Sequence, residues 1–382
     1  MNSVALYVHI PFCQRKCTYC SFNSYSGLHH LHQAYVDALE TEIAQSTRER
    51  GRLQVSSLYL GGGTPTVLSA GLLAQVLKAC TDHHALSEVA EITIEANPGS
   101  ASAALLRELR ALGVNRLSLG VQSCDEGMLA ILGRVHTVKE AMETYSLARK
   151  AGFDNINLDL IYGLPTQDLP QWEADLAAVM SLGPEHISLY CLSVEEDTPL
   201  SGEISKGELP APDPDLAAEM YETAEAELAR AGYVHYEISN WAVNGHECRH
   251  NLVYWRNEPY LGFGAGAHSF DGAFRYNNVL SPQQYVQRIA SGGEAVAARE
   301  SIDRLTEMSE TMILGLRLRE GVSFSDFQER FCAAMEGLFA DQIQELTDLG
   351  LVEVNRSAVR LTGRGRLLGN EVFERFLPPR TS

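Results

Sequence analysis

The chain has 382 residues, 45% of them hydrophobic, and its 30 basic and 49 acidic residues give a formal net charge of −19. This composition is that of a globular chain that buries a sizeable core, and the length suits one large domain with a smaller one. The acidic balance argues against nucleic acid as a partner, because phosphate binding needs a basic face.

The cysteines and the apolar runs indicate where the chain works. Eight cysteines without a paired framework favour a reducing compartment. The N-terminus shows no signal-peptide pattern, and no apolar run approaches the roughly 18 residues of a membrane-spanning helix. We therefore expect a cytoplasmic protein. Peripheral contact with a membrane and the oligomeric state, a dimer included, stay open.

The first segment of the chain carries its most specific pattern. An apolar run at 4–12 predicts a buried strand, and Cys13, Cys17 and Cys20 follow it with the spacing C-x3-C-x2-C. Thiolates are soft ligands that suit iron–sulfur clusters and zinc. A closed [4Fe–4S] site takes four cysteines, so three thiolates would leave one iron open to a small molecule.

Structural zinc is the alternative for these thiols. Zinc sites usually combine two ligand pairs, and no second pair exists here. His9, in the preceding strand, is the remaining ligand nearby. The other cysteines are single and scattered, namely Cys80, Cys124, Cys191, Cys248 and Cys332. Ligand spacing thus favours a cluster over zinc.

Strand and helix patterns alternate along the first half of the chain. Strands are predicted at 4–12, 56–60, 91–95, 116–121, 155–162 and 186–192, and helices at 31–50, 72–77, 105–112, 138–150 and 169–180. Such alternation predicts parallel strands with crossover helices. The count fits an α/β partial (β/α)6 barrel and is too short for an eightfold one. Function in such barrels collects at the carboxyl ends of the strands.

The second half of the chain predicts a barrel extension and a separate small unit. Residues 194–216 suggest an exposed proline-rich loop, followed by a helix at 216–230 and a strand at 233–241. Helices at 308–316 and 324–346, strands at 351–354 and 359–361 and a last helix from Thr362 predict a winged-helix-like α+β domain. Residues 300–382 carry 14 acidic and 10 basic residues, which favours a protein-contact or site-closing role over DNA binding. The predicted domains are 1–235, 236–299 and 300–382.

The cysteine motif resembles the signature of the radical S-adenosylmethionine (SAM) superfamily. Its context, His9 to Cys13 and then Cys17 to Phe22, resembles the family of anaerobic coproporphyrinogen III oxidases and, within it, the haem-chaperone branch. The resemblance implies a [4Fe–4S] cluster on Cys13, Cys17 and Cys20, with SAM on the open iron. The positions that match the family's SAM contacts are Tyr7, Tyr19, Gly62, Gly63, Thr64, Glu95, Gln122, Arg134 and Asp159.

Each SAM-contact position also has a chemical reason and a plain structural alternative. A Gly-Gly-Gly turn lets backbone carbonyls approach an ammonium group, and Glu95 offers a carboxylate to a ribose diol. Gln122 and the planar fork of Arg134 suit a carboxylate, whereas Asp159 stands in an apolar run where an acid is costly unless paired. Each residue alone is more often structural. Together, at successive strand ends, they favour a SAM site.

Three features resemble the haem-chaperone branch. Phe22 stands where the family dehydrogenase has a further cysteine, and only twelve residues precede Cys13, where that enzyme has a long extension. Residues 250–255 match an H-N-x-x-Y-W motif whose histidine, here His250, is proposed to ligate haem. Histidine is a common axial ligand, and aromatic rings can stack on a porphyrin. His250 as a hydrogen-bonded loop anchor is the structural alternative, and His268 and Cys248 are weaker ligand candidates.

The resemblance implies a haem chaperone that binds haem and a SAM-liganded [4Fe–4S] cluster. Its partners would be acceptor haem proteins such as respiratory enzymes. The alternative is a radical SAM enzyme acting on a porphyrinogen, as an oxygen-independent coproporphyrinogen III dehydrogenase does, or on another tetrapyrrole. A radical enzyme for an unrelated small molecule is a third hypothesis. Because of Phe22 and the short N-terminus, we predict that the chain is not a coproporphyrinogen III dehydrogenase, and we expect no single catalytic side chain.

Overall fold

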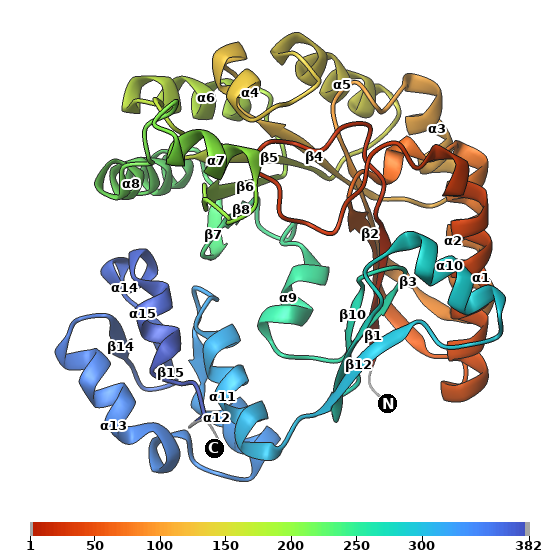
Figure 1. Cartoon of the computed structure of the whole chain (residues 1–382). Helices are drawn as coiled ribbons and strands as arrows, with labels where there is room; N and C mark the ends of the chain where they lie inside the picture. The colour runs from red at the N-terminus through yellow and green to blue at the C-terminus, as the bar shows by residue number, and fades with distance from the viewer. Residues whose placement is uncertain (1–2, 379–382) are drawn as a thin grey trace.

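The computed structural model of the chain describes residues 3–378. Its larger part is built on one 12-stranded sheet, and a smaller C-terminal part has a 3-stranded sheet of its own (Figure 1).

Six parallel strands form the curved centre of the large sheet. They are β1 (Val4–Ile10), β2 (Gln54–Gly62), β3 (Ala85–Ala96), β4 (Arg116–Gln122), β5 (Ile156–Tyr162) and β6 (His186–Cys191), paired in chain order. The outer face is covered by helices (Figure 1), namely α1 (His32–Arg50), α2 (Ala70–His83), α3 (Ala103–Ala111), α4 (Glu126–Ile131), α5 (Val138–Lys150), α6 (Leu169–Ser181) and α8 (Pro214–Arg230). The predicted partial (β/α)6 barrel is thus confirmed.

Alternation along the strands separates the core from the barrel interior. In β2, Leu58 and Leu60 join the hydrophobic core, while Ser57 and Tyr59 belong to the opposite face. Successive strand side chains point to opposite faces, so the polar set of each strand gathers inside the barrel. This polar interior is where the candidate chemistry lies.

The segment after β6 extends the same sheet at both edges. Antiparallel β8 (Asn240–Ala242) and β7 (Val234–Glu237) follow β6, and β9 (Tyr260–Phe263) pairs in parallel with β1. Antiparallel β10 (His268–Phe270), β11 (Phe274–Asn278) and β12 (Val296–Ser301) complete the other edge, with α9 (Arg249–Trp255) and α10 (Pro282–Ala290) between strands.

Two predicted elements in this region are wrong. The single strand at 233–241 is a hairpin of β7 and β8, because the chain turns at Ile238 and Ser239. The predicted loop 194–216 contains helix α7 (Pro199–Ser205). Thr198 caps α7 by accepting a hydrogen bond from the Ser201 amide at 3.2 Å, and Leu200 is fully buried.

The C-terminal part is an α+β unit with its own core. It comprises α11 (Arg304–Gly315), β13 (Val322–Ser323), α12 (Phe324–Phe331), α13 (Met335–Asp348), β14 (Val352–Val354), β15 (Ala358–Leu361), α14 (Gly363–Leu367) and α15 (Gly369–Glu374). Its strands are antiparallel in the order β13-β15-β14, and Phe327, Leu346 and Val359 lie in its core. The single predicted helix at 324–346 is interrupted at Cys332, whose φ is +47°.

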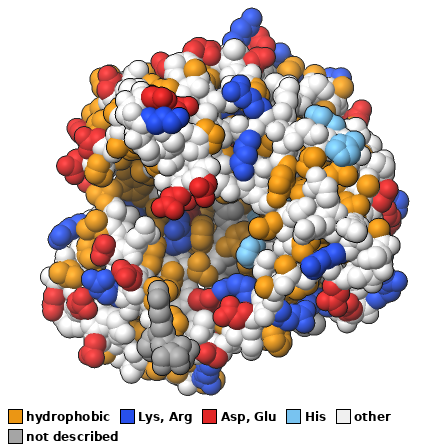
Figure 2. All heavy atoms as spheres, viewed as in Figure 1, with side chains coloured by type: hydrophobic (Ala, Val, Ile, Leu, Met, Phe, Trp, Pro, Cys, Tyr) orange, Lys and Arg blue, Asp and Glu red, His pale blue; other side chains and the backbone are white. Residues whose placement is uncertain are grey.

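A group of ion pairs joins the barrel to the C-terminal unit. Glu225 of α8 accepts hydrogen bonds from Arg319 Nη1 at 2.9 Å and from Arg366 Nη2 at 2.7 Å. The two arginines hold the side of the C-terminal unit against the barrel. Interaction with His235 and then with Arg366 lowers the pKa of Glu225 to about 2, against the raising effect of burial. On the face shown in Figure 2, acidic and basic side chains are interspersed around a central hollow. Within residues 3–378, none of the helices has the length and apolarity to cross a membrane.

Candidate functional site

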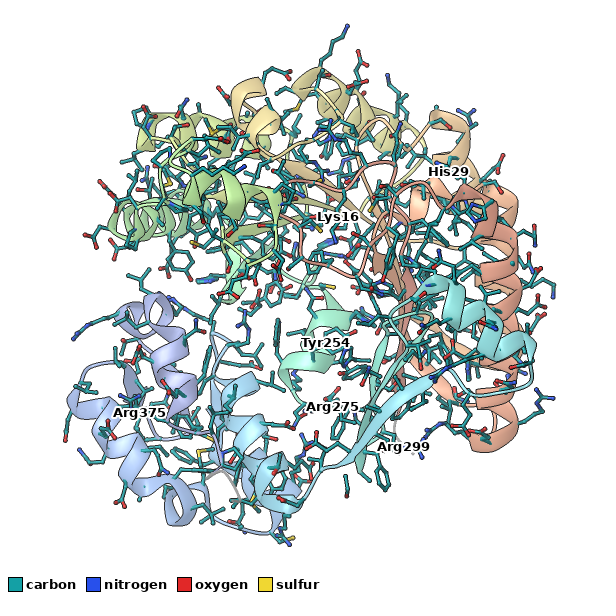
Figure 3. All side chains as sticks on the ribbon, in the orientation of Figure 1. Lys16, His29, Tyr254, Arg275, Arg299 and Arg375 are labelled. Atoms are coloured by element: carbon teal, nitrogen blue, oxygen red, sulfur yellow. The ribbon has the colours of Figure 1, made fainter. Side chains whose placement is uncertain are left out.

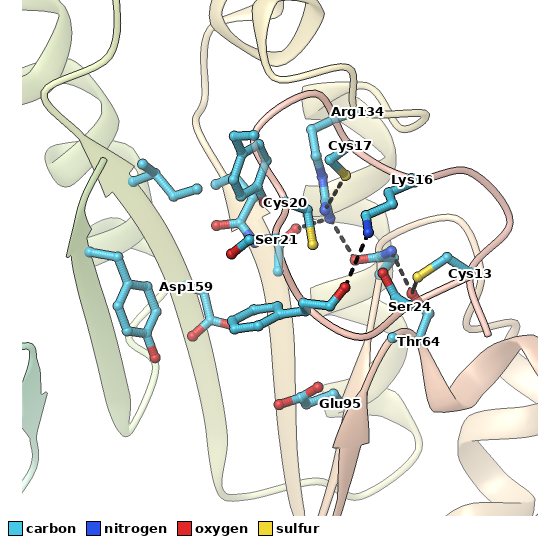
Figure 4. Close-up of a pocket in the computed structure, with 18 of the residues that line it drawn as sticks. Cys13, Lys16, Cys17, Cys20, Ser21, Ser24, Thr64, Glu95, Arg134 and Asp159 are labelled. Carbon is cyan, nitrogen blue, oxygen red and sulfur yellow. Dashed lines mark hydrogen bonds between the residues drawn. The ribbon is translucent and has the colours of Figure 1, made fainter. Parts of the chain in front are cut away.

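A pocket of about 400 Å³ opens at the carboxyl ends of the parallel strands (Figure 4). It brings together every residue predicted to hold the cluster or SAM except Tyr7, and it does not include the haem-ligand candidates His250, His268 and Cys248. Those that line it are Cys13, Cys17, Tyr19, Cys20, Gly62, Gly63, Thr64, Glu95, Gln122, Arg134 and Asp159. These residues come from four strands (β2 to β5), from the segment after α4 and from the cysteine loop, so the fold assembles one site from distant parts of the chain.

The three cysteine-loop thiols are free and line one side of the pocket (Figure 4). Thr64 Oγ1 donates to Cys13 Sγ at 3.7 Å, and Arg134 Nη1 donates to Cys17 Sγ at 3.4 Å. Among the described residues, no three His, Cys, Asp or Glu side chains converge on a single point as one metal ion requires. A cluster takes one thiolate per iron, so three free thiols on one pocket suit such a cluster.

His9 is not placed to complete a zinc site. Its Nδ1 is bonded to Tyr7 Oη at 2.9 Å and its Nε2 to the Asn23 carbonyl oxygen at 2.9 Å. Both ring nitrogens are therefore engaged, and the histidine fixes the end of the cysteine loop instead.

The glycine turn at the end of β2 lets the backbone form the wall of the pocket. Gly62 has a φ of +112°, and a Cβ there would lie 2.4 Å from the His9 ring. A Cβ on Gly63 would lie 2.6 Å from the carbonyl oxygen of Phe12, which is backbone and cannot rotate away. Only glycine fits at these two positions, which brings the turn against the cysteine loop.

Gln122 is held in a strained conformation that aims it at the pocket. Its φ is +70°, which costs a non-glycine residue on the order of 1 kcal/mol. Asp175 of α6 fixes this bend by accepting from Ser123 Oγ at 2.7 Å and the Cys124 amide at 2.9 Å. The buried Oε1 of Gln122 has no partner among the described residues. A strained residue with an unsatisfied acceptor fits a ligand that donates hydrogen bonds.

Glu95 presents a carboxylate to the lower part of the pocket. It accepts from Tyr59 Oη at 2.8 Å and from the Gly62 amide at 3.0 Å. Burial raises the pKa of Glu95 to about 7, against the lowering effect of the Tyr59 hydrogen bond. A carboxylate this deeply buried is stabilised by further hydrogen-bond donors, such as the hydroxyl groups of a ribose.

Asp159 of β5 lies beside the pocket within a hydrogen-bond network. It accepts from Asn157 Nδ2 at 2.8 Å and from Ser118 Oγ at 3.2 Å. Burial raises its pKa, and these hydrogen bonds oppose that rise. The pairing explains how an acid is tolerated in an otherwise apolar strand.

The structure adds site residues that the sequence patterns did not identify. Asn97 donates from Nδ2 to Thr64 Oγ1 at 2.9 Å and accepts at Oδ1 from Arg134 Nη2 at 2.6 Å, so it links the glycine turn to Arg134. Its position two residues after Glu95, just past the end of β3, was the sequence feature that could have identified Asn97 as a site residue. The opposite rim consists of Ile161, Tyr190, Cys191 and Leu192, and Phe22 lies at the mouth with 69% of its surface exposed.

Tyr7 and His250 lie inside the barrel but outside the pocket. Tyr7 is on β1, with its ring centroid 6.3 Å from that of His250 and 6.2 Å from that of Tyr59. His250 and Tyr254 are both on α9. In Figure 3, Tyr254 lies well apart from Lys16, which belongs to the cysteine loop that lines the pocket. The H-N-x-x-Y-W motif thus occupies a layer beneath the pocket.

The residues of the pocket fit a [4Fe–4S] cluster with SAM on its open iron. Three thiols would hold the irons, the glycine turn and Gln122 would meet the amino acid end of SAM, and Glu95 would meet its ribose. Such a pair supplies one-electron chemistry when bound. The chain supplies the positions of these groups, the buried carboxylate of Glu95 and a pocket of about 400 Å³ that is open to solvent.

Comparisons with known proteins agree with this geometry. Residues 7–179 match the radical SAM superfamily, and residues 302–368 match the HemN C-terminal domain. The heme chaperone HemW of Bacillus subtilis is 40% identical over 97% of this chain and 98% of its own length. The mitochondrial radical S-adenosyl methionine domain-containing protein 1 of Bos taurus is 36% identical over 94% of this chain and 84% of its own.

A solved structure matches nearly the whole chain. The coproporphyrinogen III oxidase HemN of Escherichia coli, a radical SAM enzyme, superposes with a TM-score of 0.86 at 28% identity and covers 98% of this chain and 90% of its own. Full-length identity is higher to the HemW proteins than to this enzyme. The chain therefore belongs to the HemW family of the radical SAM superfamily.

Proposed function

We propose that the chain is a haem chaperone that binds haem together with a SAM-liganded [4Fe–4S] cluster and passes haem to acceptor haem proteins such as respiratory enzymes. The cluster would be held by Cys13, Cys17 and Cys20. His250 is the proposed haem ligand, and Tyr254 and Trp255 of the same motif would contact the porphyrin.

One observation carries this proposal. The cysteine loop ends in Phe22, 69% exposed at the mouth of the pocket, where the family dehydrogenase has a cysteine. A phenyl ring has no atom that ligates a metal or transfers a proton, so this position offers apolar contact only. The full-length similarity to a heme chaperone supports the same conclusion.

A radical SAM enzyme acting on a porphyrinogen or another tetrapyrrole is the second candidate. It is favoured by the convergence of three positions expected to contact SAM, since Glu95, Gln122 and Arg134 all line the pocket. Beyond them, the rim of Ile161, Tyr190 and Leu192 offers apolar surface to a further ligand.

One anaerobic experiment separates the two candidates. The cluster-reconstituted protein is incubated with SAM, a reductant and coproporphyrinogen III, and separately titrated with haem. We expect haem binding that saturates near one equivalent per chain and no vinyl-bearing product. Conversion of coproporphyrinogen III without specific haem binding would reverse the assignment.

A further inference from the structure

Helix α9 closes the lower end of the barrel interior and is anchored there by a strand carboxylate. Glu91 of β3 accepts hydrogen bonds from the Arg249 amide at 3.1 Å and the His250 amide at 3.2 Å, and Cys248 Sγ donates to it at 3.4 Å. The first amides of a helix lack partners within the helix, so Glu91 satisfies them from another element. It is a positioning residue for the H-N-x-x-Y-W motif.

In this position the imidazole of His250 is sealed, meaning that it is shielded from solvent and from any ligand. Its Nδ1 is bonded to Ser57 Oγ at 3.0 Å and its Nε2 to Tyr254 Oη at 2.8 Å, and only 1% of its surface is exposed. Burial, and then the charge of Arg116, lower its pKa to about 3, so the ring is neutral. A neutral imidazole is the form that ligates iron, but neither nitrogen is accessible while α9 is seated.

The side chain of Tyr59 connects the buried histidine to the pocket. The Tyr59 ring stacks on His250, with centroids 5.0 Å apart and planes at 29°. Its hydroxyl donates to Glu95 Oε1 at 2.8 Å. A ligand that recruits the Glu95 carboxylate therefore acts on the same tyrosine that covers His250.

The anchor can open without leaving an isolated charge. Arg116 is 2% exposed, and the neighbouring Cys248 and Glu91 groups raise its pKa against the lowering effect of burial. When α9 leaves, the positive charge of Arg116 still acts on Glu91, although no direct ion pair joins the two side chains among the described residues. A buried carboxylate without a nearby cation is strongly unfavourable. The positive charge of Arg116 therefore lowers the free-energy cost of releasing α9 from Glu91.

We propose that α9 is a releasable plug, held by Glu91 and Ser57, and that His250 reaches haem iron only when the plug opens. Binding of SAM at Glu95 changes the equilibrium between the seated and the released plug, and Tyr59 transmits this change. The haem half of this inference, namely that His250 reaches haem iron, rests on the proposed function. The release of α9 and its link to the pocket do not depend on that function.

The test uses anaerobically reconstituted full-length protein and hydrogen–deuterium exchange of residues 249–255, with and without SAM. Ser57→Ala removes one buried hydrogen bond, worth about a fivefold change in an equilibrium constant. We expect about fivefold faster exchange of α9 in Ser57→Ala, with SAM changing the exchange of wild type but not of Tyr59→Phe. Ser188→Ala, a buried serine of β6 bonded to Asn157, is the matched control and should leave α9 unchanged. Glu91→Gln is a second variant in case Ser57→Ala alters the strand.

Haem titration of the same proteins completes the test. Tighter haem binding by Ser57→Ala, by about fivefold, together with faster exchange, supports the whole inference. Faster exchange with unchanged haem affinity overturns the haem half and His250 as ligand, but retains the plug. Faster exchange in a protein that never binds haem contradicts the proposed function and leaves the plug standing. Unchanged exchange in both Ser57→Ala and Glu91→Gln overturns the plug itself.

Discussion

Arg134 Nη1 lies 3.4 Å from the Sγ of Cys17, while its Nη2 is bonded to Asn97 and to the Gly120 carbonyl. The guanidinium thus holds a permanent positive charge beside a sulfur that would ligate iron. Hydrogen bonds to the sulfurs and nearby charge set the reduction potential of an iron–sulfur cluster.

We predict that Arg134→Gln shifts the cluster potential to more negative values. The reduced cluster carries the greater negative charge, so loss of the cation destabilises it relative to the oxidised form. A redox titration followed by electron paramagnetic resonance measures the shift. Arg107→Gln, at an exposed position on α3, is the control that should keep the wild-type potential. Equal potentials in all three proteins would place Arg134 outside the cluster's surroundings.

The glycine turn gives a second prediction. Gly63→Ala sets a Cβ 2.6 Å from the Phe12 carbonyl oxygen, so the turn and the cysteine loop must separate. Overpacking of this kind costs roughly 1–3 kcal/mol, and SAM affinity should fall by about tenfold or more. Equilibrium dialysis of the reconstituted protein measures it. Gly71→Ala in α2, where a Cβ meets nothing within 4 Å, should bind SAM normally.

Much of this arrangement could be predicted from the sequence, for physical reasons that differ by element. Buried parallel strands have apolar runs, and the residues just after them share one edge of the sheet, so the positions of Glu95 and Gln122 followed from the strand ends. Asn97 was not predicted as a site residue because Ala96-Asn97-Pro98-Gly99 is typical of a turn, which accounts for an asparagine without a role in binding. Helix α7 escaped although Thr198-Pro199 is a helix-start signal, because the surrounding prolines indicated a loop.

The environment of His250 could not be predicted. A motif gives residue types, whereas burial and hydrogen-bond partners depend on which strands face the segment. Ser57 and Glu91 are far from residue 250 in sequence, and only the closed barrel brings them to it. A polar residue at every second strand position, as in Ser57 and Tyr59, was the signal for a polar barrel interior.

The pKa of Glu95, about 7, predicts a pH dependence of SAM binding. The carboxylate is the better acceptor for ribose hydroxyls, so affinity should fall as the pH drops through about 7 and the group takes up a proton. Glu95→Gln should bind SAM more weakly and without this pH dependence. Isothermal titration from pH 6 to 8 tests the difference, and parallel profiles in the two proteins would rule out Glu95 as the titrating group.

His250 predicts a contribution to stability that depends on pH. Its folded pKa is about 3, below the ordinary value of about 6.5, so in this window the unfolded chain binds the extra proton. The free energy of unfolding should therefore fall as the pH drops from about 6.5 towards about 3. Urea unfolding at several pH values should show a shallower fall for His250→Gln. His30→Gln, at an exposed histidine, should keep the wild-type slope.

The most direct test of the central claim is a haem titration of the anaerobically reconstituted protein, followed by absorbance, for wild type, His250→Ala and His268→Ala. We expect saturation near one haem per chain in wild type and His268→Ala, with binding weakened at least tenfold in His250→Ala. Equal haem affinity in all three proteins would contradict His250 as the ligand, and absence of specific binding in wild type would contradict the haem-chaperone function.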